Sequence, residues 1–463
     1  MTPRPRPLLA SILVLGVLGA AGPAGAQDLA AEAAAVRDKA LSDPTAWRIV
    51  ESLTTEVGAR PVGTAAMARA RDWALAKLAS LGFENVRAEP FTTKAWIRGE
   101  ESAEVVAPAP QKLRILGLSG SAPTPKGGLT GEVALFPTYQ AMLDQPAGAL
   151  DGKIAVVTQA MTRTQDGSGY GAILAQRAHG ATEAAKRGAI AYLVRSLSTM
   201  QTRAPHAGYA DYAGIPAAAL SPPDAEQLER LAALGKPVSL KLVMASTVDP
   251  AATAWNVVGE IRGRERPDEL IVVGGHLDSW DPGTGATDDG AGVAITTAAA
   301  RLATLHARPR RTIRVVLWGS EEQGGSGSAY AAAHAAEVGN VVLAGEADIG
   351  AERVWRVALP AAGRDHPAVK AFLAALAPFS VVVSPDPAVR GGADVDGLVQ
   401  AGAPVVQVAQ DASRYFDFHH SADDTLDKID PKALAQATAV WASLLEVVAN
   451  SDVDFRPRGA SSP

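Results

Sequence analysis

The chain of 463 residues contains no cysteine, which excludes a disulfide framework and a cysteine-linked lipid anchor. Neither Gly-x-Ser-x-Gly nor His-Glu-x-x-His occurs, so the motifs of elbow-type serine hydrolases and of single-zinc proteases are missing. Aromatic residues make up only 5% of the chain, and no basic stripe is interleaved with them, so nucleic-acid binding is not expected. Core packing must hold the protein together, and its hydrophobic content of 47% is sufficient for two domains.

Long hydrophobic runs are also absent, apart from one near the N-terminus. Arg4 and Arg6 precede an apolar run over residues 8–21, and a small-x-small sequence, Ala24-Gly25-Ala26, follows it. The run is shorter than the roughly 20 residues that a membrane span needs. We therefore expect a signal peptide over residues 1–26, a secreted or periplasmic protein, and no stable membrane anchor.

Two adjacent acidic residues, Glu321 and Glu322, follow the apolar run 312–318 and open a glycine-rich stretch. Alone, such a pair is usually a solvated helix start. At the end of a strand, however, the two carboxylates can lie on either side of a reaction centre, where one binds a metal ion and the other moves protons. The pair therefore indicates metal-assisted hydrolysis, provided that further ligands are found elsewhere.

Further candidates follow other predicted strands, because sites on an open α/β sheet draw residues from several strand ends. The apolar run 269–275 leads to His276, and Asp278 comes two residues later. That carboxylate can accept the second ring N–H of a metal-bound imidazole and fix its tautomer. Asp288 lies at a loop-to-helix junction, where its two oxygens can bridge two cations.

Two more segments offer alternatives rather than single candidates. The predicted strand 340–344 runs into Glu346 and Asp348, and a later segment contains the adjacent histidines His419 and His420. From the residues alone, Glu346 competes with Asp348 as a ligand, and His419 competes with His420.

These five elements, in this order, resemble the zinc-dependent exopeptidases of metallopeptidase family twenty-eight, most closely its plasma glutamate carboxypeptidase branch. The resemblance extends over nearly the whole mature chain and implies two zinc ions per chain. It implies these ligands: Asp288, Glu322 and His420 at one zinc, and His276, Asp288 and Asp348 at the other.

The family pattern also implies roles for the remaining residues. Glu321 becomes the general base, and Asp278 becomes the partner of His276. The ligand histidine stands directly before Ser or Thr in this family, with Asp-Thr following, which favours His420 over His419. A cis peptide bond after the bridging Asp288 is implied as well.

Strand and helix patterns divide the chain into two parts. The pattern predicts one α/β zinc exopeptidase domain, with a mixed central sheet and helices on both faces, built from residues 27–122 and 249–455. Residues 123–248 have a strand and helix order of their own and resemble an inserted protease-associated α/β domain. We expect this insert to be a spacer without a ligand site, and residues 456–463 to be a disordered tail.

The expected activity is hydrolysis of dipeptides or short unblocked peptides by a metal-activated water, with Glu321 as the base. A peptide is thus the expected partner, and a monomer and a homodimer are both compatible with the sequence. Two alternatives remain: a glutaminyl-cyclase-like enzyme, which would use a single zinc, and a non-catalytic peptide-binding protein. Outside the motifs, His334 is expected to face solvent, and His206 lacks a carboxylate at ligand spacing.

Overall fold

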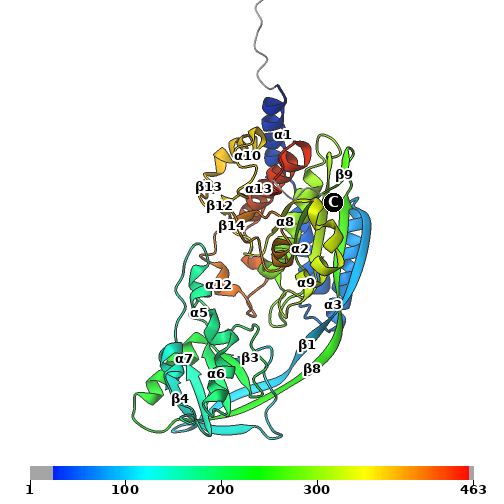
Figure 1. The fold of residues 1–463 in the computed structure, drawn as a ribbon. Coiled ribbons are helices and arrows are strands. Elements are labelled where there is room, and N and C mark those ends of the chain that lie inside the picture. The colour runs from blue at the N-terminus through cyan, green and yellow to red at the C-terminus, as the bar shows by residue number, and fades with distance from the viewer. Residues whose placement is uncertain (1–23, 458–463) are drawn as a thin grey trace, which may run out of the picture.

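The computed structural model describes residues 24–457, which form two lobes joined by a long two-stranded ribbon (Figure 1). The ribbon pairs β1 (Glu84–Ala107) with β8 (Ser239–Ile261) in antiparallel register over most of their length. We call the part that contains α1 to α3 and all elements after β8 the large lobe, and the elements between β1 and β8 the small lobe. The ribbon belongs to both, because β8 pairs with β10 of the large lobe at one end and with β4 of the small lobe at the other.

The large lobe contains the mixed central sheet that the sequence predicts. Its strands β9 (Arg266–His276), β10 (Arg311–Trp318) and β11 (Val341–Glu346) run parallel in the order β11-β9-β10, and β8 joins β10 antiparallel. Alternate side chains of β9 enter different cores: Ile271 and Val273 pack on one face, and Leu270 and Val272 on the other. Strands buried on both faces need a layer of helices on each side.

Helices supply both layers. The helices of the large lobe are α1 (Ala24–Ala40), α2 (Thr45–Ser52), α3 (Ala65–Ser80), α8 (Ala291–Leu302), α9 (Ser326–Ala333), α10 (Pro367–Leu376), α11 (Asp396–Gln400), α12 (Tyr415–Phe418) and α13 (Pro431–Asn450). Trp441 of α13 shares the core that contains Ile271, whereas Tyr330 of α9 shares the core that contains Val272. A small second sheet, β13 (Val382–Val383), β12 (Val354–Ala358) and β14 (Gln407–Gln410), completes the lobe.

Helix α13 is long and apolar enough to cross a membrane, but 89% of its apolar window is buried inside the protein. It is therefore a core helix of the large lobe. The predicted signal peptide, 1–26, lies almost entirely outside the described residues, and so does most of the predicted tail. Before that tail, Phe455 is 1% exposed and packs in the core, and the first tail residue, Arg456, forms ion pairs with Asp454 and Glu269.

The small lobe continues the same hydrogen-bonded sheet beyond the ribbon. Its elements are β2 (Gln111–Leu113), β3 (Ile115–Gly117), β4 (Leu129–Phe136), α4 (Tyr139–Leu143), β5 (Lys153–Val157), α5 (Ser168–Ala178), α6 (Gly180–Lys186), β6 (Ala191–Arg195), β7 (Ala217–Leu220) and α7 (Pro222–Ala232). Strands β4 to β7 are parallel, and β3 closes the edge antiparallel to β7. Strand β5 contributes Ile154 and Val156 to one core and Ala155 and Val157 to another, so this lobe has its own hydrophobic interior on each face of its sheet.

Candidate metal centre

Three neighbouring strands end at the same edge of the large-lobe sheet and deliver polar side chains there. His276 is the last residue of β9, and Asp348 lies two residues after β11. Glu321 and Glu322 follow β10 after a short turn. Because these strands are parallel neighbours, their carboxyl ends meet, which is where open α/β sheets bind ligands.

Asp288 reaches this edge from the short turn η2 (Ala286–Gly290), which leads into α8 and in which Asp288 and Asp289 have non-helical backbone angles. Asp424 fixes the turn, because its carboxylate accepts hydrogen bonds from Thr287 N (2.6 Å), Thr287 Oγ1 (2.7 Å) and Asp288 N (3.2 Å). The peptide bond between Asp288 and Asp289 is cis, as the family resemblance implies. The main chain is thus held so that the carboxylate of Asp288 faces the strand ends.

Each oxygen of Asp288 lies within a separate group of candidate ligands. Oδ1 is 3.0 Å from His276 Nε2, which is 3.4 Å from Asp348 Oδ1. Oδ2 is 3.1 Å from His420 Nε2, which is 3.0 Å from Glu322 Oε2. Two ligand atoms on one tetrahedral zinc are about 3.3 Å apart. Asp288 Oδ2 and Glu322 Oε1 are buried without a hydrogen-bond donor in residues 24–457, so the donor set fits divalent cations.

The acidic alternatives to Asp348 are engaged elsewhere. Glu346 Oε2 accepts the N–H of Asp394 at 2.9 Å, which ties Glu346 to the loop before α11. The two oxygens of Asp289 accept main-chain N–H groups at 2.9 Å, from His276 and from the first turn of α8. Among these three carboxylates, Asp348 is thus the one that faces His276 Nε2.

The two adjacent histidines are separated by geometry as well. His420 Nε2 contacts both Asp288 and Glu322, whereas His419 Nε2 is 3.8 Å from Asp288 Oδ2. The rings of His419 and His420 are stacked with centroids 3.5 Å apart. His420 has a φ of 60°, which is uncommon for a residue other than glycine and is found where surrounding contacts impose it.

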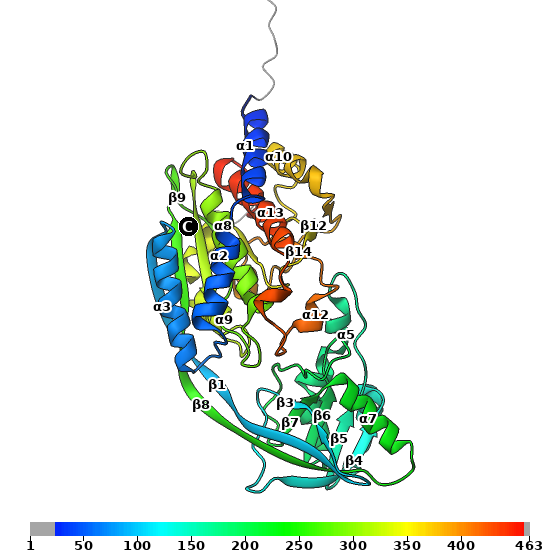
Figure 2. The same ribbon diagram turned by 180° about the vertical axis from the view of Figure 1, so that it is seen from behind.

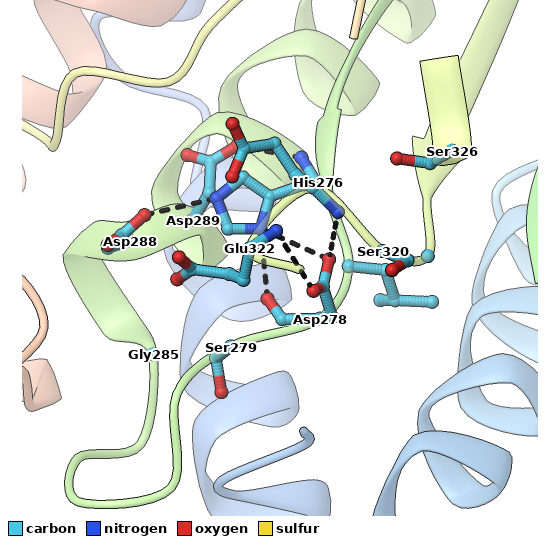
Figure 3. Close-up of polar contacts among 12 residues, drawn as sticks. His276, Asp278, Ser279, Gly285, Asp288, Asp289, Ser320, Glu322 and Ser326 are labelled. Atoms are coloured by element: carbon cyan, nitrogen blue, oxygen red, sulfur yellow. Dashed lines mark hydrogen bonds and ion pairs between the residues drawn. The ribbon is translucent and has the colours of Figure 1, made fainter. Parts of the chain in front are cut away.

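Asp278 holds the glutamate pair in place, and Figure 3 shows its side chain beside Glu322. Its carboxylate accepts the N–H of Glu321 at 3.0 Å and the N–H of Glu322 at 3.3 Å. His276 Nδ1 lies 3.0 Å from the main-chain oxygen of Asp278 and 3.5 Å from its carboxylate. The expected contact with His276 therefore runs mainly through the backbone of Asp278, and its side chain orients the two glutamates.

Negative charge is concentrated at this edge. Burial, and then the charge of Asp288, raises the pKa of Glu322 to about 7. Burial, and then the charge of Asp348, raises the pKa of Glu321 well above its ordinary value. The carboxylate of Glu321 forms no hydrogen bond with any described residue, so it is free to exchange a proton with a molecule in the pocket.

A pocket of about 550 Å³ opens onto these residues and is lined by both lobes. The large lobe contributes Asp288, Glu321, Glu322, Gln323, Gly324, Asp348, Ile349, Tyr415, Phe416, His419 and His420. The small lobe contributes Tyr170, Leu174, Arg177 and Tyr209. Sequence reasoning missed these four residues, because no spacing relates them to the ligand motifs. The insert was expected to be a spacer, and a spacer would not be expected to line the pocket.

The small lobe also contacts the His420 segment through its main chain. Ala207 N donates to His420 O at 2.8 Å, and Ala207 O lies 3.2 Å from His420 Nδ1. The neighbouring His206 is 2% exposed, and its ring centroid is 6.4 Å from that of His419. Burial, and then the charge of His420, lowers the pKa of His206 to about 3, so this histidine is a neutral residue of the interface between the lobes.

Arg60 was also missed by the sequence reasoning. Its side chain is fully buried and donates to Leu277 O, to Thr284 O at 2.7 Å and to Gly285 O at 2.9 Å. Burial lowers the pKa of Arg60, and the charge of Asp424 opposes this effect. Arg60 thus fastens the loop between β9 and η2, whose two ends carry His276 and Asp288.

Comparisons with known proteins agree with this geometry. Residues 256–445 match the family model described as peptidase family M28. Carboxypeptidase Q of Bos taurus is 37% identical over 412 residues, which cover 88% of this chain and 85% of the relative. A crystal structure of a peptidase M28 precursor from Shewanella amazonensis superposes with a TM-score of 0.90 at 42% identity, covering 93% of this chain and 99% of the other.

A more distant structure shares the fold. BSAP, a zinc aminopeptidase from Bacillus subtilis, superposes with a TM-score of 0.62 at 19% identity, over 89% of this chain and 96% of the other. The identity and coverage of the carboxypeptidase Q relative decide the family. This chain belongs to peptidase family M28 and is a metallopeptidase.

Proposed function

We propose that the protein is a secreted exopeptidase that hydrolyses dipeptides or short unblocked peptides with two zinc ions. One observation carries the proposal: the two oxygens of Asp288 face separate groups of metal-binding side chains, His276 with Asp348 and His420 with Glu322. A bridging carboxylate of this kind is what a pair of co-catalytic ions requires.

The proposed chemistry assigns one role to each carboxylate of the glutamate pair. Zinc in this site would polarise the scissile carbonyl and lower the pKa of a bound water. Glu321 accepts a proton from the attacking water and returns it to the leaving amine. Burial raises the pKa of Glu321, which helps this carboxyl to hold the proton between the two steps. Glu322 serves as a ligand, and Asp278 keeps both glutamates aligned.

The same proposal extends to organisation and location. The large lobe is the peptidase domain, for which the sequence predicts residues 27–122 and 249–455. The small lobe is the inserted protease-associated domain, predicted over residues 123–248, although its sheet already includes β2 and β3. The N-terminal basic residues, apolar run and small-x-small sequence support export from the cytoplasm. The N-terminal segment would then be absent from the mature enzyme.

Metal stoichiometry combined with product analysis tests the proposal. The purified enzyme should contain two zinc ions per chain, lose peptidase activity on chelation and regain it when zinc is added back. Its products from dipeptides, blocked dipeptides and tripeptides should be single residues released from a chain end. One metal ion per chain in fully active enzyme would contradict the paired site and favour the cyclase-like alternative. Two ions without hydrolysis of any peptide would favour a binding protein.

A further inference from the structure

Arg177 is a buried cation that faces the pocket from the small lobe. It lies on α5, is 6% exposed and lines the pocket together with Glu322 and His420. Helix α5 lies beside α12 in both views of the molecule, so the small lobe reaches the metal centre at this point (Figures 1 and 2). The stacked rings of Tyr170 and Phe416, with centroids 4.7 Å apart, hold the two helices together.

The guanidinium of Arg177 has few partners. Nε donates to Tyr209 O at 3.2 Å, and Cζ is 5.4 Å from the ring centroid of Tyr170. Nη1 is 3.4 Å from His420 Nδ1. If Nε2 of His420 binds the metal, the ring proton is on Nδ1. Nδ1 then donates a hydrogen bond to the main-chain oxygen of Ala207 and cannot accept one from Arg177. The N–H groups of the two Nη atoms are then available to a molecule in the pocket.

No carboxylate of residues 24–457 forms an ion pair with Arg177, although burying an unpaired charge is costly. The same lobe pairs its other buried arginine: Arg195 is 7% exposed, and its Nη2 lies 3.1 Å from Glu226. The pocket that Arg177 lines also contains Glu322 and Asp288, whose charges bound zinc would neutralise. A substrate anion is therefore the partner that this arginine lacks.

The chain leaves space for this guanidinium at Gly208. A Cβ at that position would lie 2.4 Å from Arg177 Cζ, and Gly208 has a φ of 139°. Glycine is thus required at position 208 for two reasons. A side chain would collide with the guanidinium, and the backbone conformation is one that other residues rarely adopt. The residue lets the guanidinium pack against the main chain beside Ala207 and Tyr209, which form the wall of the small lobe next to His420.

We propose that Arg177 binds the free C-terminal carboxylate of the substrate and thereby directs hydrolysis to the last peptide bond. This inference rests on the proposed function and specifies its substrate class. Consecutive Cα atoms are about 3.8 Å apart, so a carboxylate one residue beyond the scissile carbonyl lies close to the metal centre. Arg177 is also close to the metal centre, because its Nη1 lies 3.4 Å from Nδ1 of His420. A guanidinium binds a carboxylate through two parallel N–H groups, which fixes its position as well as its charge.

Substrates that differ in one carboxylate test the proposal. The probes are alanyl-alanine, its C-terminal amide, and alanyl-glutamic acid α-amide, whose only carboxylate is in the side chain. The wild-type enzyme should hydrolyse alanyl-alanine with a kcat/KM about ten- to a hundredfold above that of either amide, since a hydrogen bond to a charged group contributes that much. Rapid hydrolysis of alanyl-glutamic acid α-amide would overturn the C-terminal assignment in favour of side-chain recognition.

Variants separate recognition from structure. Arg177→Gln should lower kcat/KM for alanyl-alanine by about ten- to a hundredfold. The variant should retain zinc, and its kcat/KM for the C-terminal amide of alanyl-alanine should stay nearly unchanged. Arg177→Lys should recover part of the loss, and Gly208→Ala should imitate Arg177→Gln by displacing the guanidinium. Arg195→Gln, a matched buried arginine of the same lobe, should preserve the preference for the free acid.

Two results would overturn the inference while the proposed function stands. One is a wild-type enzyme that hydrolyses the acid and the amide equally well. The other is an equal loss of both activities in Arg177→Gln, together with loss of zinc, which would mean that Arg177 only offsets the charge of the ligands. Failure of the zinc-loaded enzyme to hydrolyse any of the three probes would overturn both the inference and the proposed function.

Discussion

Arg163 of the small lobe and Asp417 of the large lobe form a two-point ion pair. Nη1 of Arg163 donates to Oδ2 of Asp417 at 3.0 Å, and Nη2 donates to Oδ1 at 2.5 Å. Thr199 of the small lobe adds a hydrogen bond to the same carboxylate at 2.7 Å. Because Asp417 lies three residues before His420, this pair ties a proposed zinc ligand to the small lobe.

Arg163→Gln should therefore weaken metal binding although Arg163 touches no ligand. Residues that orient metal ligands typically change affinity by 10- to 100-fold when mutated, and we expect about tenfold here because the arginine is partly exposed. The measurement is the zinc retained per chain during titration with a chelator. Arg203→Gln breaks a comparable pair with Asp224 inside the small lobe and should retain zinc normally. Equal zinc loss in both variants would show that Arg163 affects only general stability.

The two glutamates should respond differently to substitution. Glu321→Gln removes the proposed base but no ligand, so zinc content should stay near that of the wild type while kcat falls by about 10²- to 10⁴-fold. Glu322→Ala removes a ligand and should reduce zinc content, with partial recovery of activity at high zinc concentration. Metal analysis and steady-state kinetics on the same preparations measure both effects. If the two variants lose zinc alike and neither is selectively slow, the roles are assigned wrongly.

The sequence predicts the ligand edge well, because that edge depends on local patterns. His276, Glu322 and Asp348 each follow an apolar run that forms a parallel strand, and parallel neighbours necessarily end at one edge. The choices of Asp348 over Glu346 and of His420 over His419 came from the family resemblance, and the zinc ligands themselves stay a prediction. The cores on both faces of the large-lobe sheet likewise follow from strands that read as continuous apolar runs.

What the sequence does not predict depends on contacts between distant segments. Arg177 lies 99 residues before the first proposed ligand, His276, and reaches the pocket only because the ribbon of β1 and β8 brings the small lobe against α12. His334 was expected in solvent, which is wrong: its ring contacts Glu337 at 3.0 Å and Glu89 of the ribbon at 2.9 Å. No residue near His334 in the chain indicates the second partner.

A dipeptide with a free amino group should be hydrolysed faster than its N-acetyl form. The pocket contains four carboxylates, those of Asp288, Glu321, Glu322 and Asp348, and a positively charged ammonium group is attracted to this concentration of negative charge. Acetylation removes that charged contact, which costs a few kcal/mol, or about tens- to hundredfold in kcat/KM. The measurement compares alanyl-alanine with N-acetyl-alanyl-alanine at equal zinc loading. Equal rates would argue against recognition of the amino terminus and leave the carboxylate as the recognised end.

A pH-dependent effect on stability is expected far from the pocket, at Glu446 of α13. This side chain is 1% exposed, accepts one hydrogen bond from Asn450 at 3.1 Å, and has no donor for Oε2 within the described residues. Burial, and then the charge of Glu32 on α1, raises its pKa from 4.5 to about 7. Between these two values the unfolded chain releases a proton that the folded protein keeps, so this residue lowers stability as pH rises through that range and costs most above pH 7.

Glu446→Gln removes the ionisation and should stabilise the protein increasingly as the pH rises from 4.5 to about 7, with the full gain above pH 7. A pKa difference of two to three units corresponds to an upper bound of about 3 kcal/mol in the free energy of unfolding above pH 7, and to almost nothing near pH 4.5. Thermal unfolding at pH 5.0 and pH 8.5 measures this, because every other titrating group is shared by the two proteins. Glu32→Gln is the matched control and should give a smaller gain at pH 8.5, since it removes the neighbouring charge but not the burial. A gain from Glu446→Gln that is the same at both pH values would mean that packing, not the buried charge, accounts for the effect.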